Sequence, residues 1–149
     1  MLDVCTGSGC VAVSVVAALV TPRRGAMEPP APPMQASAVA TDLVPAAVDL
    51  ALRNATRHAL QQSIEFRVGD LFEPLQPHEA CGFDLITANP PYISDAEWAQ
   101  CEPNVRDHEP VTALRGGPDG LRIITPLLQQ AADRKSTRLN SSHLVISYA

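Results

Sequence analysis

The fold is indicated most directly by the stretch Asp3-Val4-Cys5-Thr6-Gly7-Ser8-Gly9. The apolar run Cys10 to Val20 follows it. The residues Met1 to Val4 are typical of the end of a buried strand. Gly7 and Gly9 permit a tight turn and a close approach of the backbone to another group. The apolar run is long enough for a helix whose free N–H groups would face a ligand. Taken alone, the pattern also fits a glycine turn that joins a strand to a helix and binds nothing.

Two carboxylates follow later candidate strands. Residues 37–41 form a short run compatible with a strand and end at Asp42, and residues 64–68 alternate in the strand manner before Gly69 and Asp70. A carboxylate just past the second strand of such a unit commonly accepts hydrogen bonds from ribose hydroxyls. Each aspartate taken singly also suits a helix cap or a turn. Their repeated placement at strand ends favours one ligand lying along that edge of the sheet.

The apolar run Phe83 to Ala88 ends in the polar turn Asn89-Pro90-Pro91-Tyr92. The Asn89 side chain offers one acceptor oxygen and two N–H donors. The two prolines fix their own φ angles and bias the residue before each toward an extended conformation. Tyr92 can lay its ring beside a planar group. We therefore expect this turn to hold a planar amide for chemistry.

Strands and helices alternate between these motifs. Pro45 suits the first turn of a helix, residues 94–102 and 121–132 are expected to be helical, and residues 116–120 a loop. Such alternation predicts an α/β protein with a doubly wound, mostly parallel sheet and helices on both faces. Ligands bind beyond the carboxyl ends of the strands in such sheets, which is where the motifs fall. The apolar residues that share one face of the Pro45 helix by their spacing are Val44, Ala47, Val48, Ala51, Leu52 and Ala55.

Together, these motifs resemble those of the class I S-adenosylmethionine-dependent methyltransferases, which have a Rossmann-like fold. The downstream stretches Asn104 to Pro110 and Ala113 to Leu121 narrow the match. They closely resemble the protein-(glutamine-N5) methyltransferases that modify the Gly-Gly-Gln loop of peptide-chain release factors. The similarity covers roughly residues 1–132. It implies methylation of a glutamine side-chain nitrogen during the maturation of the translation termination machinery.

The resemblance implies S-adenosylmethionine as the cofactor and a release factor as the protein substrate. It implies that Asp3 orients the glycine turn or reaches the amino group of the cofactor, and that Asp42 binds the ribose hydroxyls. Asn89 would border both the cofactor and the substrate. The residues implied for the methionine part of the cofactor are Cys5, Thr6, Gly7, Ser8 and Gly9, and those for the adenine are Asp70 and Leu71. The implied catalytic residues are Asn89, Pro90 and Tyr92, and the glutamine would be held by Asn89, Pro90, Pro91 and Tyr92.

Composition is compatible with this reading. A chain of 149 residues is long enough for one domain with a modest core. A net charge of -5 without a basic cluster argues against an affinity based on nucleic-acid phosphates. The four cysteines lack metal-type spacing, so we expect no metal and free thiols in a reducing cytoplasm. The apolar run 11–20 is too short to span a bilayer, and we expect a monomer without a membrane or nucleic-acid partner.

Three segments depart from a complete enzyme, and we expect residues 1–134 to be a partial catalytic domain truncated at both ends. The chain opens inside the first strand, and the resemblance implies a substrate-recognising helical domain that is missing here. Residues 21–36 are rich in proline and are typical of a flexible insertion loop. Residues 135–149 resemble translated adapter sequence rather than the family. Their apolar residues 144–146 could still be recruited as a makeshift strand.

Three other functions remain open from the sequence. A nucleic-acid adenine N-methyltransferase could use the same Asn-Pro-Pro-Tyr turn, because the adenine amine is also a planar, conjugated nitrogen. A glutamine methyltransferase of a ribosomal protein shares the Cys-Thr-Gly-Ser-Gly-Cys run. The chain could also be an inactive fragment. Two further residues have alternative roles: Trp98 packs on the sheet or grips the substrate, and His108 is expected in a loop or an ion pair rather than as a base.

Overall fold

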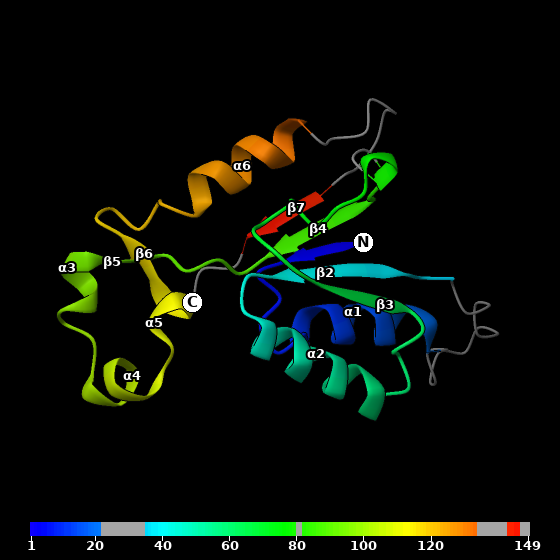
Figure 1. Cartoon of the computed structure of the whole chain (residues 1–149), viewed down its shortest axis with the longest axis horizontal. Helices are drawn as coiled ribbons and strands as arrows, with labels where there is room; N and C mark the ends of the chain where they lie inside the picture. Colours follow the sequence, from blue (N-terminus) through cyan, green and yellow to red (C-terminus); the bar gives the residue numbers. More distant parts are fainter. Residues whose placement is uncertain (22–34, 80–81, 134–142, 147–149) are drawn as a thin grey trace, which may run out of the picture.

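The computed structural model describes residues 1–21, 35–79, 82–133 and 143–146. Its centre is a five-stranded sheet in the order β3-β2-β1-β4-β7, in which every neighbouring pair is parallel (Figure 1). The chain order reverses between β1 and β4, and this switch point is where ligands bind in open α/β sheets. The strands are β1 Leu2–Val4, β2 Ala38–Asp42, β3 Ile64–Val68, β4 Leu85–Ala88 and β7 His143–Ile146.

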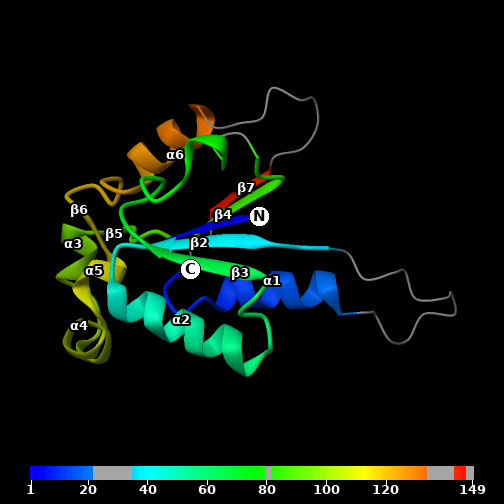
Figure 2. The same cartoon turned by 45° about the vertical axis from the view of Figure 1, so that its right-hand side comes forward.

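Helices cover both faces of the sheet. Helices α1 (Cys10–Val20) and α2 (Pro45–Arg57) lie on one face, and α6 (Ile124–Asp133) lies on the other (Figures 1 and 2). Two clusters of buried apolar residues separate these layers. The cluster on the α6 side includes Leu2, Val4, Val39, Phe72 and Leu127, and the cluster on the α1 and α2 side includes Val13, Val16, Ala40, Ala55 and Ile64.

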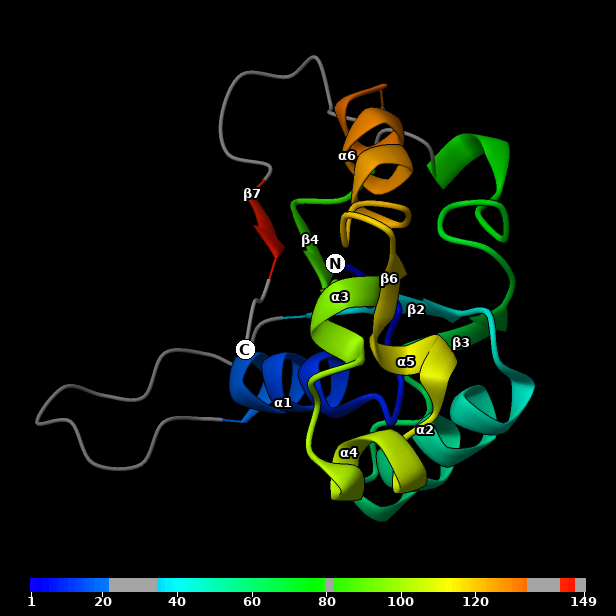
Figure 3. The same ribbon diagram turned by 90° about the vertical axis from the view of Figure 1, so that its left-hand side faces the viewer.

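Residues 93–121 form a separate group of short elements beyond the carboxyl ends of the strands. Figure 3 shows this group in front of the sheet when the carboxyl edge faces the viewer. Strands β5 and β6 pair with each other in parallel and do not join the main sheet. The elements are β5 Ile93–Ser94, α3 Asp95–Trp98, α4 Pro103–His108, α5 Val111–Leu114 and β6 Arg115–Gly117, and a 3-10 turn, η1, lies earlier at Pro77–Glu79.

The predicted fold class is confirmed, and so are the strand before the glycine turn and the helices that begin at Cys10 and Pro45. Three details of the prediction are wrong. The glycine-rich stretch expected as a loop includes the last two residues of β6, the helix expected over residues 94–102 is only α3, Asp95–Trp98, and the last predicted helix begins at Ile124 rather than at residue 121. The apolar face predicted for α2 is only partly covered: Leu52 and Val44 are 46% and 37% exposed, because only the inner part of the stripe faces the sheet.

The predicted proline-rich insertion and tail fall largely outside the described residues. Strand β7 is an exception, since residues 143–146 pair with β4 as the sequence allowed. Cys81 also lies outside the described part, whereas Cys5, Cys10 and Cys101 are free thiols. None of the helices in the described ranges is long and apolar enough to cross a membrane.

Candidate functional site

The pairing of β1 with its two neighbours brings the motifs to one edge. Val4, the last residue of β1, is the register partner of Thr41 in β2 and of Ala88 in β4. The glycine turn begins after Val4, and Asn89 follows Ala88. Neighbouring strands lie about 4.8 Å apart, so the turn at residues 5–9 and the turn at residues 89–92 begin side by side at the carboxyl edge.

The glycine turn has the tight geometry that the sequence predicted. The amide of Gly9 donates to the Thr6 carbonyl at 2.9 Å, and Gly7 and Gly9 have φ angles of 56° and 76°, in the left-handed region that glycine favours. A Cβ on Gly9 would lie 2.9 Å from the Ala51 Cβ, so the turn packs closely on α2. A Cβ on Gly7 would meet nothing within 4 Å. The turn therefore presents open space above Gly7, where a ligand can contact its backbone.

Asp42 joins the end of β2 to this turn. Its Oδ2 accepts a hydrogen bond from the Gly7 amide at 2.8 Å, and its Oδ1 accepts one from the Val44 amide at 2.9 Å. The turn-closing role that the sequence left open is thus present. The carboxylate is also half-exposed at the ligand-facing edge, and each carboxylate oxygen has a further lone pair for an incoming hydroxyl.

Asp3 lies inside the molecule rather than at its surface, with a relative exposure of 2%. Thr6 donates its hydroxyl to Asp3 Oδ2 at 2.6 Å, and Thr87 donates its hydroxyl to Asp3 Oδ1 at 2.6 Å. Burial raises the pKa of Asp3, and these two hydrogen bonds oppose that rise. Of the two roles that the resemblance implied, this geometry supports orientation of the glycine turn.

Two further contacts define the turn. Burial, assisted by the carboxylates of Asp42, Asp3 and Asp70, raises the pKa of the Cys5 thiol to about 12. Cys5 is therefore a thiol at neutral pH and not a nucleophilic thiolate. The side-chain amide of Asn54 in α2 donates to the Ser8 carbonyl at 2.9 Å. Sequence reasoning missed Asn54, because its partner is 46 residues away and no local motif marks it.

The segment after β3 contributes mainly through its backbone. Asp70 is exposed, whereas the Leu71 side chain is 5% exposed and belongs to the core cluster on the α6 side. Thr41 holds this segment by donating its hydroxyl to the Leu71 carbonyl at 2.8 Å. Leu71 itself has a φ of 45°. Any contact of Leu71 with a ligand at this edge would therefore involve its main chain.

The turn at residues 89–92 is anchored at its middle and open at its start. Pro90 is fully buried, whereas Asn89 is exposed and Pro91 and Tyr92 are half-buried. The Gly116–Gly120 segment packs on this turn, because a Cβ on Gly120 would collide with the Tyr92 carbonyl. The rigid corner thus leaves the exposed Asn89 directly after the carboxyl end of β4.

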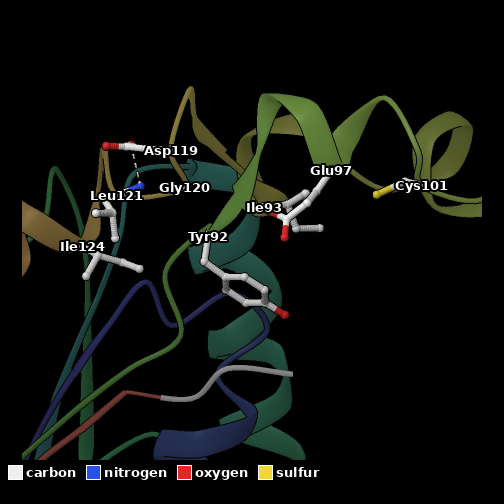
Figure 4. Close-up of a pocket in the computed structure, with 8 residues that line it drawn as sticks. All are labelled: Tyr92, Ile93, Glu97, Cys101, Asp119, Gly120, Leu121 and Ile124. Atoms are coloured by element: carbon white, nitrogen blue, oxygen red, sulfur yellow. Dashed lines mark hydrogen bonds between the residues drawn. The ribbon is translucent and has the colours of Figure 1, made fainter.

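A pocket of about 380 Å³ adjoins Tyr92 (Figure 4). Tyr92 and Ile93 line it from the turn, and Gly120, Leu121 and Ile124 line it from the segment that leads into α6. The remaining lining residues are Glu97, Cys101 and Asp119. The pocket therefore extends the site from the turn into residues 93–124, which the sequence assigned only through the resemblance.

The two residues with alternative roles lie outside the pocket lining. Trp98 is half-buried at the end of α3. His108 is exposed and ends α4, so the expectation of a loop is wrong. Neither residue gains support as a catalytic group from the described structure.

Comparisons with known proteins agree with the motifs. The chain is 40% identical over 129 residues to a release factor glutamine methyltransferase of Geobacter sulfurreducens, with 85% of the chain aligned. It is 37% identical over 134 residues to the Rhodopirellula baltica protein of the same name, with 90% of the chain aligned. A ribosomal protein uL3 glutamine methyltransferase of Bordetella pertussis is 37% identical over 130 residues, with 87% of the chain aligned.

The chain is homologous over most of its length to glutamine methyltransferases. The resemblance seen in the motifs is thereby confirmed. The chain spans 38–40% of the length of these three relatives. No protein-family model matches it.

The fold of this chain is also found among solved structures. The catalytic domain of hMettl16 in complex with a MAT2A 3'UTR hairpin superposes with a TM-score of 0.59 at 16% identity. The match covers 90% of this chain and 46% of that one. At this identity the likeness concerns the fold alone, which is Rossmann-like.

Proposed function

We propose that this chain carries the catalytic part of an S-adenosylmethionine-dependent methyltransferase that modifies a glutamine side chain in the Gly-Gly-Gln loop of a release factor. The observation that carries the proposal is the pairing of Val4 with Ala88, which sets the glycine turn beside Asn89. A methyl donor on the turn and an amide on Asn89 would then be neighbours. The names of the most similar relatives support glutamine as the target.

The described residues fit the cofactor. The open space above Gly7 leaves room for a group on the turn backbone, and the half-exposed Asp42 offers acceptors to ribose hydroxyls. Asp3, Cys5, Thr6, Ser8 and Gly9 shape the turn, while Asp70 and the Leu71 backbone border the adenine position. S-adenosylmethionine supplies an electrophilic methyl group on a sulfonium centre.

The substrate amide would be held by the turn at residues 89–92. The Asn89 side-chain oxygen and the Pro90 carbonyl each accept one N–H of the glutamine amide, and Tyr92 packs against the amide plane. A glutamine nitrogen is a poor nucleophile because its lone pair is delocalised into the carbonyl. Two acceptors favour the positive charge that builds up on the N–H groups. Fixed orientation in such a site can supply about 7–11 kcal/mol of a barrier.

Release factors and ribosomal proteins are cytoplasmic, so we propose a cytoplasmic location for this chain. Ribosomal protein uL3 is the second candidate substrate, because some relatives of similar identity carry that name. A nucleic-acid substrate has less support. The described edge presents Asp42 and Asp70, and the chain has a net charge of -5.

The test is a methyl-transfer assay with radiolabelled S-adenosylmethionine on three substrates: a release factor, protein uL3 and a DNA duplex. Release factor with its Gly-Gly-Gln glutamine changed to alanine is the matched control. We expect label only on the unaltered release factor. Label on uL3 alone, or on DNA alone, would show that the release factor is not the substrate. Cofactor binding without any transfer would indicate an inactive fragment.

A further inference from the structure

Thr87 is a buried residue of β4 that links the turn at residues 89–92 to the glycine turn at residues 5–9. It is 8% exposed, lies in β4 two residues before Asn89, and is the register partner of Asp3. Its hydroxyl donates to Asp3 Oδ1 at 2.6 Å, and the Leu2 carbonyl is a more distant acceptor at 3.4 Å. Residues two apart in an extended chain point to the same side of the sheet. Thr87 therefore links the strand that carries Asn89 to a carboxylate in the neighbouring strand.

That carboxylate also holds the glycine turn. Thr6 donates its hydroxyl to Asp3 Oδ2 at 2.6 Å, and the Thr6 carbonyl accepts the Gly9 amide at 2.9 Å, which closes the turn. Gly9 is also the N-cap residue of α1. The position of the buried Asp3 carboxylate thus helps to determine where the turn that leads into α1 lies.

We propose that Thr87 is a positioning residue that acts through Asp3 to hold the cofactor turn in register with Asn89. The inference deepens the proposed function and rests on it, because it assumes that the cofactor lies on the glycine turn. Thr87 itself lies beneath the edge and would touch neither cofactor nor substrate. Its effect is carried by the single oxygen Asp3 Oδ1.

Among the described residues, Thr87 is the side-chain donor to Asp3 Oδ1, and no second side-chain donor is found at that oxygen. A valine at position 87 has the shape of threonine but leaves Asp3 Oδ1 buried without its short bond. An unsatisfied buried carboxylate oxygen is costly, so the side chain would shift toward other donors. Such a shift would move the Thr6 contact, and with it the glycine turn.

The test is titration calorimetry of the full chain with S-adenosylmethionine. The informative variants are Thr87→Val, which removes the hydroxyl, and Thr87→Ser, which keeps it. Ile86→Val is the matched control, because Ile86 is also buried in β4 but packs in the cluster on the α6 side. The same comparison is made in an Asp3→Asn background. Melting temperatures are recorded for every variant.

We expect Thr87→Val to weaken cofactor binding by about 5- to 20-fold and Thr87→Ser to restore most of it. Ile86→Val should bind nearly as the unaltered chain does, even where its melting temperature falls as far. In the Asp3→Asn background Thr87→Val should have little further effect, because both changes act on one contact.

Three results would overturn the inference while leaving the proposed function intact: normal binding by Thr87→Val, no recovery in Thr87→Ser, or full additivity with Asp3→Asn. If the unaltered chain binds no S-adenosylmethionine, the cofactor site itself is wrong and both proposals fail. If Thr87→Val does not fold, Thr87→Ala, which also removes the hydroxyl, replaces it in each comparison, and normal binding by Thr87→Ala or its full additivity with Asp3→Asn would overturn the inference.

Discussion

Buried side-chain hydrogen bonds through Asp3 hold the glycine turn, whereas the side-chain hydrogen bonds described within residues 93–121 are exposed or part-buried. Asp3, with an exposed fraction of 2%, is held between Thr6 and Thr87. In the second region, Arg115 and Asp95 form an ion pair at 2.7 Å with side chains that are 43% and 38% exposed. Helices α3, α4 and α5 contain no buried residue. The two halves of the candidate site therefore differ in how firmly they are built.

This difference matches what each half has to bind. A small cofactor of fixed shape favours a preorganised site, since ordering the site on binding would reduce the affinity. A protein loop as substrate tolerates a surface with few buried contacts, which belongs to the less stable part of a structure. We infer that changes in the first region alter cofactor binding, and that changes in the second alter substrate recognition.

The largest effect is expected at the junction of the two regions. Asn89→Ala should lower the turnover number by about 10²- to 10³-fold, because it removes an acceptor that acts on developing charge. The cofactor Kd should change far less, since Asp42 and the turn backbone remain. Steady-state assays and calorimetry measure the two quantities. Gln61→Ala, at an exposed site outside the edge, is the control, and near-normal turnover by Asn89→Ala would remove Asn89 from catalysis.

A purely cofactor-side effect is expected for Asp42→Ala. The variant loses the acceptor for ribose hydroxyls and also the bond to the Gly7 amide. We expect the Kd for S-adenosylmethionine to rise about 10- to 100-fold, measured by calorimetry. Asp49→Ala is a matched control with an exposed aspartate on α2. An unchanged Kd for Asp42→Ala would exclude Asp42 from the cofactor site.

Two ion pairs, Arg67 with Glu79 between β3 and η1 and Arg115 with Asp95 within residues 93–121, allow a second comparison, which concerns the stability of the fold rather than binding. Arg67 in β3 binds Glu79 at 2.6 Å, and their side chains are 14% and 16% exposed. Hydrogen bonds from Arg67 hold the pKa of Glu79 at about 2, below its usual 4.5. A lowered acid pKa stabilises the fold above the unfolded value and loses this contribution as the pH falls through the folded value.

We therefore expect Glu79→Gln to lower the free energy of unfolding by about 1 kcal/mol at pH 7. The difference from the unaltered chain should shrink between pH 4.5 and about 2, as Glu79 becomes protonated. Urea unfolding at several pH values measures it. Glu73→Gln, an exposed glutamate in the same loop, serves as the control. A difference that stays constant with pH would show that the ion pair is not its source.

The smallest stability effect is expected for Arg115→Gln. The pair with Asp95 joins β6 to α3 at the surface, where solvent screens it. We expect no measurable change in melting temperature and an increase in the KM for the protein substrate. A clear loss of thermal stability would mean that the second region is built as firmly as the first.

The strands and the first two helices were predictable because their signals are local. Alternation marks residues 64–68, and the apolar run after Gly9 marks α1. Strand β6 was missed, because glycines have a low strand propensity and its pairing with β5 spans the whole of residues 95–114. Leu52 and Val44 share the predicted apolar face of the helix but are partly exposed, because periodicity identifies a face but not how far the sheet covers it.

In the candidate site, too, local features could be predicted from the sequence and long-range contacts could not. The turns at residues 5–9 and 89–92 could be predicted from their glycines and prolines, and their adjacency from parallel strands. The supporting contacts could not be predicted, because Thr87, Asn54 and Thr41 bond to groups far away in the sequence. A buried threonine in a strand looks like an ordinary β-branched residue until its neighbour is known.

The central claim is that the glycine turn and the Asn89 corner form one site around the cofactor. Titration of the ¹⁵N-labelled chain with S-adenosylhomocysteine, followed by NMR, tests it most directly. We expect the amides of Gly7 and Gly9 and the side-chain amide of Asn89 to shift along one binding curve with a single Kd. Shifts of the glycines while the Asn89 signal stays unmoved would contradict the claim.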